Sequence, residues 1–249
     1  RLLNASKGPA VQSLRAQIDK KAYTRYMKAE IEKAGVRLIQ GMVTEIPLAK
    51  GRVQGVRLED GTEIRAESVI LCTGVYLESR IIIGDKVIES GPMGEGNAKG
   101  LSSYLASLGF EIGRFKTGTS PRIHKDSIDW DELTPEASID KPSRFSFMSE
   151  PRMWQKQVCY STYTNDRTHK VIRDNIDRAP LFDGTIEGVG PRYCPSIEDK
   201  IMRFPDRRRH QVYLEIESEE SCDVYILGLS TSLPEDVQYQ MVHTLPGLT

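Results

Sequence analysis

The sequence lacks the patterns that mark metal-binding, disulfide-rich and membrane-spanning proteins. Its four cysteines, Cys72, Cys159, Cys194 and Cys222, form no Cys-x-x-Cys pair, which argues against a zinc site and against a disulfide framework. No apolar run approaches the roughly 20 residues that span a bilayer, and no signal-peptide pattern opens the chain. Its histidines show no metal-ligand spacing. Reduced thiols and a cytoplasmic, metal-free, non-membrane protein are therefore expected.

The chain also has almost no net charge. The formal charge is -1, so a nucleic-acid-binding surface would have to be local. A hydrophobic content of 39% with 28% charged residues is typical of a soluble globular protein rather than a disordered one. The 249 residues are enough for one large domain or two smaller ones.

The most informative segment is GVGPRYCPSIEDK, residues 188–200. It places Cys194 between two prolines and two residues after Arg192. A nearby cation favours the nucleophilic thiolate, and proline stiffens the loop that presents it. This pattern indicates a reactive cysteine, although spacing alone is equally compatible with a cysteine that simply marks a turn.

Further segments extend this pattern over the whole chain. They are NASKGPAV (4–11), GRFKTGT (113–119), TYTN (162–165) followed by Thr168-His169, and GLSTSLPEDV (228–237). Together with residues 188–200, and in this order, they resemble the glucose-inhibited division protein A family of flavoenzymes, which modify the wobble uridine of certain tRNAs. One departure is Ser120-Pro121-Arg122, where the family commonly has Pro-Pro-Arg.

The resemblance also implies that the gene product is longer than this chain. The family's first strand and its Gly-x-Gly-x-x-Gly turn are expected before residue 1, and its C-terminal helical region after residue 249. We call this expected longer protein the full-length protein, and we expect the chain by itself to be inactive.

Residue patterns in the first half predict a helix over 9–34, extended segments at 36–39 and 42–46, and a small β-meander around 53–58. A short apolar strand over 66–72 then ends at Thr73-Gly74. This layout is typical of two-dinucleotide-binding flavoproteins, in which a glycine lets the backbone pass close to a ligand.

The second half is predicted to alternate strands and helices. Helices are expected over 101–108, over 166–178 behind the cap Asn165, and after a capping box at Ser232 and Glu235, with Pro234 in the first turn. Strands are expected at 111–115, 157–164, 211–216 and 223–229, with an exposed acidic loop over 126–142.

These elements give the predicted fold class. It is α/β, part of a glutathione-reductase-like FAD fold with a β-meander and an inserted α+β domain. Residues 1–112 are expected to belong to the FAD-binding domain, 113–222 to an inserted NAD(H)- and substrate-binding domain, and 223–249 to the FAD-binding domain again.

Two glycine-rich segments are interpreted as decoys. Residues 94–100 do not match the dinucleotide spacing, and residues 113–119 lack the Lys-Ser/Thr pair of a phosphate loop. The resemblance instead implies that 113–119 lines the active cleft.

The resemblance assigns the candidate site. Cys194 is the expected nucleophile, Arg192 supports it, and Glu198 or Asp199 could act as the base, although helix-start charge and local ion pairing are the more ordinary roles for such acids. Val43, Thr73 and Gly74 are expected at the flavin. Nicotinamide-nucleotide contact is implied for Gly190, Pro191, Arg192, Tyr193, Cys194, Pro195, Ser196, Ile197, Glu198, Asp199, Lys200, Ile201, Met202, Arg203 and Phe204.

Positive charges cluster near this segment. Lys170, Arg173, Arg207, Arg208 and Arg209 are candidate RNA contacts, although a charge run is more often a solvated face. His169 is as plausible a structural histidine as a substrate contact. Cys72 and Cys159 are expected to be structural, with Cys72 buried, and Cys222 at least partly exposed.

The resemblance implies a reaction that uses FAD, NADH and methylenetetrahydrofolate, with glycine or ammonium completing the group at uracil C5. It also implies tRNA, an MnmE-type GTPase and a second copy of the chain as partners. A different class remains open, in which the polypeptide is a non-catalytic RNA- or partner-binding part of a flavoprotein. An ordinary flavin disulfide reductase would need a redox cysteine pair that this sequence does not contain.

Overall fold

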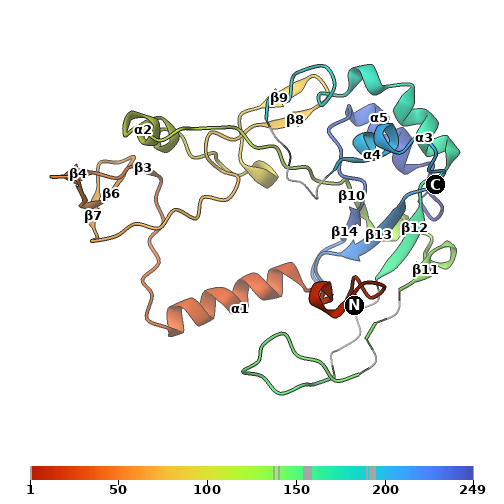
Figure 1. Ribbon diagram of the computed structural model, residues 1–249, viewed down its shortest axis with the longest axis horizontal. Helices are drawn as coiled ribbons and strands as arrows, with labels where there is room; N and C mark the ends of the chain where they lie inside the picture. Colours follow the sequence, from red (N-terminus) through yellow and green to blue (C-terminus); the bar gives the residue numbers. More distant parts are fainter. Residues whose placement is uncertain are drawn as a thin grey trace.

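The computed structural model describes residues 2–136, 138–139, 141–153, 159–188, 190 and 195–248. Figure 1 shows a sheet covered by helices at one end and a group of small sheets at the other, with the helix α1 extending between them. The chain starts beside the large sheet and ends beside the helices that cover it.

The large sheet has five antiparallel strands in the order β10-β14-β13-β12-β11. Alternate side chains such as Val212, Leu214, Val224 and Ile226 are fully buried, as expected for a sheet with one covered face. Its strands are β10 (Arg122–His124), β11 (Thr134–Pro135), β12 (Tyr160–Tyr163), β13 (Gln211–Ile216) and β14 (Asp223–Leu227).

Three helices lie over one face of this sheet: α3 (Asp166–Arg173), α4 (Ile197–Arg203) and α5 (Glu235–Val242) (Figure 1). Each contributes apolar side chains to one core with the strands, among them Ile172, Ile201 and Met241. Full burial of each such side chain contributes about 1.5–3 kcal/mol, so this core is the main source of stability.

The start of α3 was predicted correctly and the start of α5 was not. Asn165 caps α3 in a reciprocal capping box with Thr168. At α5, Pro234 occupies the cap position and makes no side-chain capping bond. Ser232 lies two residues before the cap and instead donates its backbone N–H and its hydroxyl to Glu198.

Helix α1 (Lys20–Lys33) begins eleven residues later than the predicted start at residue 9. Residues 9–11 form the short 3-10 helix η1 (Pro9–Val11), and β2 (Ser13–Leu14) pairs with β1 (Leu2–Leu3). Asp19 then caps α1 by accepting a hydrogen bond from the backbone of Ala22. The pairing of β1 with β2 therefore keeps this segment extended, although its apolar periodicity predicted a longer helix.

The predicted β-meander is present as a three-stranded antiparallel sheet in the order β3-β6-β7. Its strands are β3 (Val43–Glu45), β6 (Gly55–Leu58) and β7 (Glu63–Arg65). Separate hairpins are formed by β4 (Leu48–Ala49) with β5 (Arg52–Val53) and by β8 (Ile81–Ile83) with β9 (Lys86–Ile88). Helix α2 (Leu101–Ser107) lies close to its predicted position.

Two predicted strands, 66–72 and 111–115, are not assigned as strands. A strand needs a neighbour for its backbone groups, and among the described residues the pairing of these two segments is limited to a single β-bridge residue, Phe115. Ile70 is 88% exposed and Cys72 is exposed, so the prediction that Cys72 is buried is wrong. Cys222 is exposed, as expected, and Cys159 is half-buried.

The predicted exposed loop over 126–142 is only partly one. It contains the 3-10 helices η3 (Lys125–Ser127) and η4 (Trp130–Glu132) and then β11. Ile128 and Leu133 are buried in the main core, which ties this acidic segment to the sheet. Two further 3-10 helices are η2 (Pro92–Gly94) and η5 (Ile176–Arg178).

The mixed α/β character was predicted correctly. Residues 223–248 pack on the same sheet as β10, β12 and β13, so the predicted boundary at 222/223 lies inside one packed unit. The assignment of the three segments to FAD and NAD(H) domains stays a prediction. In the described part of the chain, no helix has both the length and the apolar character needed to cross a membrane.

Candidate active site around the start of helix α4

The start of α4 is fixed to the segment that follows β14. The backbone N–H of Ile197 donates to the carbonyl oxygen of Ser230 at 2.7 Å, and Lys200 Nζ donates to the carbonyl oxygen of Gly228 at 3.0 Å. Ser196 caps the helix by accepting a hydrogen bond from the backbone of Asp199 at 3.4 Å. Residues 196–200 and 228–230 therefore form one connected unit.

Glu198 is the most unusual residue of this unit because its side chain is fully buried. Its Oε1 accepts hydrogen bonds from the backbone N–H and the hydroxyl of Ser232, at 3.3 and 3.5 Å. Its Oε2 is buried and has no hydrogen-bond partner among the described residues. Glu198 is therefore not a solvated charge at the start of a helix, which was the ordinary role expected from the sequence.

Asp199 points the other way and pairs with Arg203 of the same helix at 2.8 Å. This is the local ion pairing that the sequence allowed for these acids. Met202, Arg203 and Phe204 are exposed along the end of α4. The helix thus separates one buried acid from one paired at the surface.

The segment 113–119 reaches the same place from a different part of the chain. The backbone N–H of Thr231 donates to the carbonyl oxygen of Thr119 at 3.2 Å. A Cβ on Gly118 would lie 2.1 Å from the hydroxyl oxygen of Ser230, so any larger residue there would require the Ser230 side chain to move. Two of the sequence segments that carry the resemblance, 113–119 and 228–237, are therefore in direct contact.

The residues that lead into the cysteine loop lie against 113–119 as well. Gly188 has a φ of +131°, and a Cβ on it would lie 2.7 Å from the carbonyl oxygen of Arg114. A Cβ on Gly190 would lie 2.9 Å from the Cε atom of Lys116. Pro191, Arg192, Tyr193 and Cys194 lie outside the described residues, so the structure places both ends of the cysteine loop but not the cysteine.

Comparison with known proteins now decides the family. The family model "Glucose inhibited division protein A" matches residues 1–249. The chain belongs to this family.

Relatives at 49% identity are tRNA uridine 5-carboxymethylaminomethyl modification enzymes MnmG from Desulfitobacterium hafniense strain Y51 and Clostridium botulinum strain Loch Maree / Type A3. Each match covers 100% of this chain and 40% of the relative. The structure of Aquifex aeolicus GidA in its form I crystal matches with a TM-score of 0.90 and 44% identity, over 100% of this chain and 43% of that one. The chain therefore spans less than half the length of its relatives.

Within this member of the GidA family, His169 is a structural histidine by its contacts. It is buried, and its Nε2 lies 2.8 Å from the hydroxyl of Thr164, which also accepts a hydrogen bond from the backbone of His210. Burial, and then the positive charge of Arg173, lower the pKa of His169. Burial also lowers the pKa of His210, with further contributions from His169, Lys200 and Arg207.

The candidate RNA contacts lie at the surface near this histidine pair. Lys170 pairs with Asp174 at 2.6 Å, and Arg173 donates to the carbonyl oxygen of Pro205 at 3.3 Å. The Arg209 guanidinium lies 4.5 Å from the centre of the Tyr163 ring. Because Arg173 reaches residue 205, the basic edge of α3 continues into the exposed segment 205–209.

The candidate flavin residues lie apart from α4. Val43 is half-buried in β3, which Figure 1 shows at the opposite end of the molecule from α4. Thr73 accepts a backbone hydrogen bond from Tyr76 at 3.1 Å, and Gly74 has a φ of +54°, so the predicted turn is present. Backbone groups and apolar surface of this kind suit the uncharged adenine end of FAD, while none of Val43, Thr73 and Gly74 can supply charge to its pyrophosphate.

Ser120 and Ser230 are site residues that the sequence did not single out. Their hydroxyl oxygens are buried and have no hydrogen-bond partner among the described residues, as is true of Glu198 Oε2. Serine is common in turns, and nothing in the local sequence separates these two from ordinary turn residues. Only the contact between 113–120 and 228–232 reveals them.

Proposed function

We propose that the full-length protein modifies the wobble uridine of tRNA by adding a carboxymethylaminomethyl or aminomethyl group at uracil C5. The observation that carries this proposal is the family match over residues 1–249, together with relatives named for this modification. The convergence of the family's segments around the start of α4 supports a single site for the chemistry.

Cys194 is the proposed nucleophile. Uracil C5 is a poor nucleophile until a thiolate adds at C6, which makes C5 part of an enolate that can attack an electrophilic methylene group. Loss of the C5 proton and expulsion of the thiolate then restore the C5–C6 double bond. Arg192 would stabilise the thiolate before the addition or the enolate oxygen after it.

The base that removes the C5 proton is proposed to be Glu198 or Asp199. Burial of Glu198, whose Oε2 has no hydrogen-bond partner among the described residues, supports a proton acceptor shielded from solvent, whereas its bond to Ser232 supports a positioning role. Asp199 is committed to Arg203 at 2.8 Å. The geometry therefore favours Glu198 over Asp199 as the base.

FAD, reduced by NADH, is the proposed cofactor, and methylenetetrahydrofolate the one-carbon donor. FAD supplies the redox chemistry that links the one-carbon unit to the uracil. Val43 and the Thr73-Gly74 turn are the residues of this chain that we propose to contact FAD. Residues 190–204 are proposed to contact the nicotinamide nucleotide. A homodimer that works with an MnmE-type GTPase completes the proposal.

The test is Cys194→Ser in the full-length protein, with Cys222→Ser as the matched control because Cys222 is exposed. The first variant should keep its fold and flavin but lose uridine modification, because a serine hydroxyl is far less ionised than a thiol near neutral pH. The measurement is modified wobble uridine in tRNA from cells that carry only the variant, beside the melting temperature. Near-normal modification by Cys194→Ser would remove the cysteine from the mechanism.

The competing function, a non-catalytic RNA- or partner-binding part of a flavoprotein, makes a different prediction. It assigns no catalytic residue to this part of the protein, so the full-length Cys194→Ser variant should keep uridine modification, and the modification assay separates the two functions. The 249-residue chain alone should be colourless or weakly yellow, because no residue assigned to FAD in it can hold the pyrophosphate. Tightly bound stoichiometric FAD on the chain alone would contradict that assignment.

A further inference from the structure

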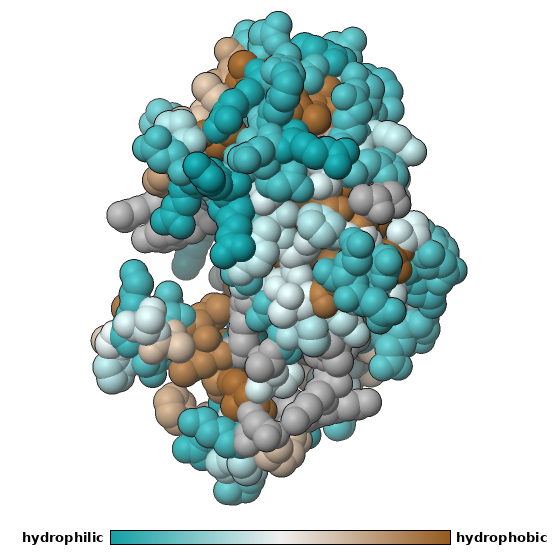
Figure 2. Space-filling model, turned by 90° about the vertical axis from the view of Figure 1, so that its right-hand side faces the viewer, coloured by the Kyte–Doolittle hydropathy of each residue, from teal (hydrophilic) through white to brown (hydrophobic). Residues whose placement is uncertain are grey.

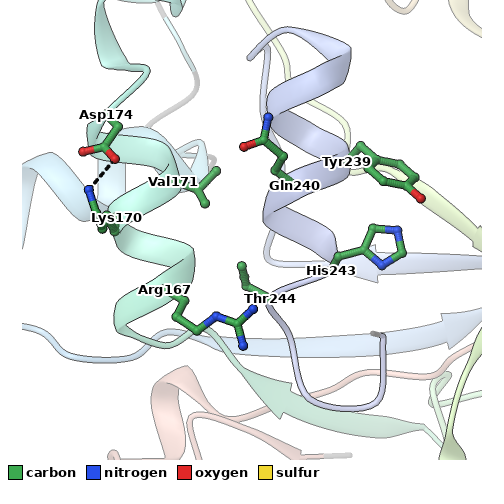
Figure 3. Close-up of a pocket in the computed structure, with 8 residues that line it drawn as sticks. All are labelled: Arg167, Lys170, Val171, Asp174, Tyr239, Gln240, His243 and Thr244. Carbon is green, nitrogen blue, oxygen red and sulfur yellow. Dashed lines mark hydrogen bonds and ion pairs between the residues drawn. The ribbon is translucent and has the colours of Figure 1, made fainter.

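A groove of about 490 Å³ lies between α3 and α5, apart from the start of α4 (Figure 3). Figure 3 shows Arg167 extending from α3 toward the C-terminal end of α5, near Thr244, with Val171 between the helices. The lining residues are Arg167, Lys170, Val171, Asp174, Tyr239, Gln240, His243 and Thr244.

One side of the groove offers positive charge. Arg167 is exposed and makes no hydrogen bond or ion pair to the described residues, whereas Asp174 is neutralised by Lys170 at 2.6 Å. Arg167, Lys170 and Arg173 follow one another along α3 at intervals of three residues, so they share a face of the helix. Through the Arg173 contact with Pro205, this face continues to Arg207 and Arg208.

An aromatic surface lies next to the groove, on the side of α5 that Figure 3 shows turned away from α3. The ring of Tyr239 is 69% exposed and lies 4.2 Å from the ring of His243, centre to centre, with an angle of 56° between the planes. His243 follows directly after α5, so the two rings stand one turn apart. Figure 2 shows that the surface at the height of these helices is largely hydrophilic, with small separate hydrophobic patches.

We propose that a single-stranded segment of the RNA substrate crosses this groove and α5, with an unpaired base against Tyr239 and a phosphate of the same strand against Arg167. Single-stranded nucleic acid is bound by such a pairing of an aromatic ring with nearby cations, and each stacked base contributes about 1–3 kcal/mol. A paired RNA helix keeps its bases stacked inside and could use only the cations. The inference rests on the proposed function because it takes tRNA as the substrate.

The experiment measures binding of two RNA probes by the full-length protein: an anticodon stem-loop and a fully paired duplex of equal length. Tyr239→Ala should weaken stem-loop binding by roughly fivefold or more and leave duplex binding unchanged. Tyr239→Phe should restore stem-loop binding because it keeps the ring. Arg167→Gln should weaken binding of both probes, because phosphate contact does not depend on pairing.

Matched controls come from α1, where Tyr26 is 61% exposed and Lys28 is exposed. Tyr26→Ala and Lys28→Gln should bind both probes as the unaltered protein does. Equal stem-loop binding by Tyr239→Ala and the unaltered protein would overturn the inference, as would an unaltered protein that binds neither probe. A change in oligomeric mass without a change in RNA binding would instead make the groove a protein contact and also overturn it.

The two hypotheses fail in distinguishable ways. If the unaltered protein binds the stem-loop through Tyr239 but leaves wobble uridine unmodified, the proposed function fails and the groove stands. If the protein modifies uridine and Tyr239→Ala changes neither binding nor modification, the groove fails and the function stands.

Discussion

Glu198 and Ser232 lie 34 residues apart in the chain, yet the buried carboxylate of the first accepts a 3.3 Å hydrogen bond from the backbone N–H of the second. This contact joins the helix that follows the cysteine loop to the segment between β14 and α5. It acts together with the bonds of Ile197 to Ser230 and of Lys200 to Gly228, which hold the start of α4 and with it the exit of the cysteine loop.

Glu198→Ala should therefore lower the melting temperature of the full-length protein. Removing a buried acceptor leaves the Ser232 N–H unpaired, which costs about 1–3 kcal/mol. The matched control, Glu32→Ala on the exposed face of α1, should have little effect. Glu198→Gln keeps an acceptor for Ser232 and separates the two roles: modification lost without loss of stability indicates the base, and modification retained indicates positioning alone.

Gly118→Ala should destabilise the contact between the segments 113–119 and 228–232. The added Cβ would lie 2.1 Å from Ser230 Oγ, and overpacking of this kind typically costs about 1–3 kcal/mol. Ser230→Ala removes that oxygen, so the double variant should recover most of the loss in melting temperature. Gly113→Ala is the control, since nothing lies within 4 Å of a Cβ there. A double variant no more stable than Gly118→Ala would show that a different contact is responsible.

Strands and helices were predicted well from the sequence where one face of the element packs against other parts of the same chain. The strand at 211–216 and the cap at Asn165 are as expected, and the strand predicted at 223–229 is present but ends at 227, because the alternation of apolar residues and a capping side chain are local properties. The segment 66–72 has equally apolar residues but no described pairing partner. Its exposed Ile70 shows that a strand cannot be inferred without the neighbour that completes it.

The candidate site was only partly predictable for the same reason. Residue types and order identified 188–200, 113–119 and 228–237 as important, but not that Gly118 touches Ser230 or that Glu198 is buried. Those facts depend on contacts between distant parts of the chain. Tyr239 has no local pattern that marks it, and only its exposed ring beside the basic groove makes it a candidate contact.

Asn165 should contribute to stability through two separable bonds. Its Oδ1 accepts from the backbone of Thr168 at 3.0 Å, and its Nδ2 donates to the carbonyl oxygen of Thr244 at 2.6 Å. Asn165→Ala removes both, and the cap alone is worth about 0.5–2 kcal/mol. Asn165→Ser keeps a capping oxygen and loses the donor to Thr244, so its melting temperature should fall between those of the alanine variant and the unaltered protein. Identical melting temperatures for the serine and alanine variants would mean that the cap contributes nothing.

His169 and His210 should make the protein less stable as the pH falls below about 6.5, the ordinary pKa of histidine. Burial lowers the pKa of both in the folded state, so the unfolded chain binds protons first and stability rises with pH through this range. The slope is at most about 1.4 kcal/mol per pH unit for each proton. The measurement is thermal unfolding between about pH 5.5 and pH 7.5, a range that brackets the ordinary histidine pKa of about 6.5. His169→Gln should flatten the dependence, and His124→Gln, at an exposed site, should not.

Arg207, Arg208 and Arg209 should contribute to tRNA affinity by neutralising phosphates rather than by recognising sequence. All three are exposed, and Arg209 is already held against the Tyr163 ring, which fixes the end of this basic segment. Replacing all three by Gln in the full-length protein should weaken tRNA binding and reduce the slope of log affinity against log salt by roughly 0.7–0.9 for each phosphate that is no longer neutralised.

The control replaces Lys21, Lys28 and Lys33 on α1 by Gln, which removes the same formal charge from another surface. If both triple variants shift the slope equally, the effect is one of net charge. If only the arginine variant does so, the segment 207–209 lies on the RNA, and an unchanged slope in that variant would reduce these arginines to a solvated face.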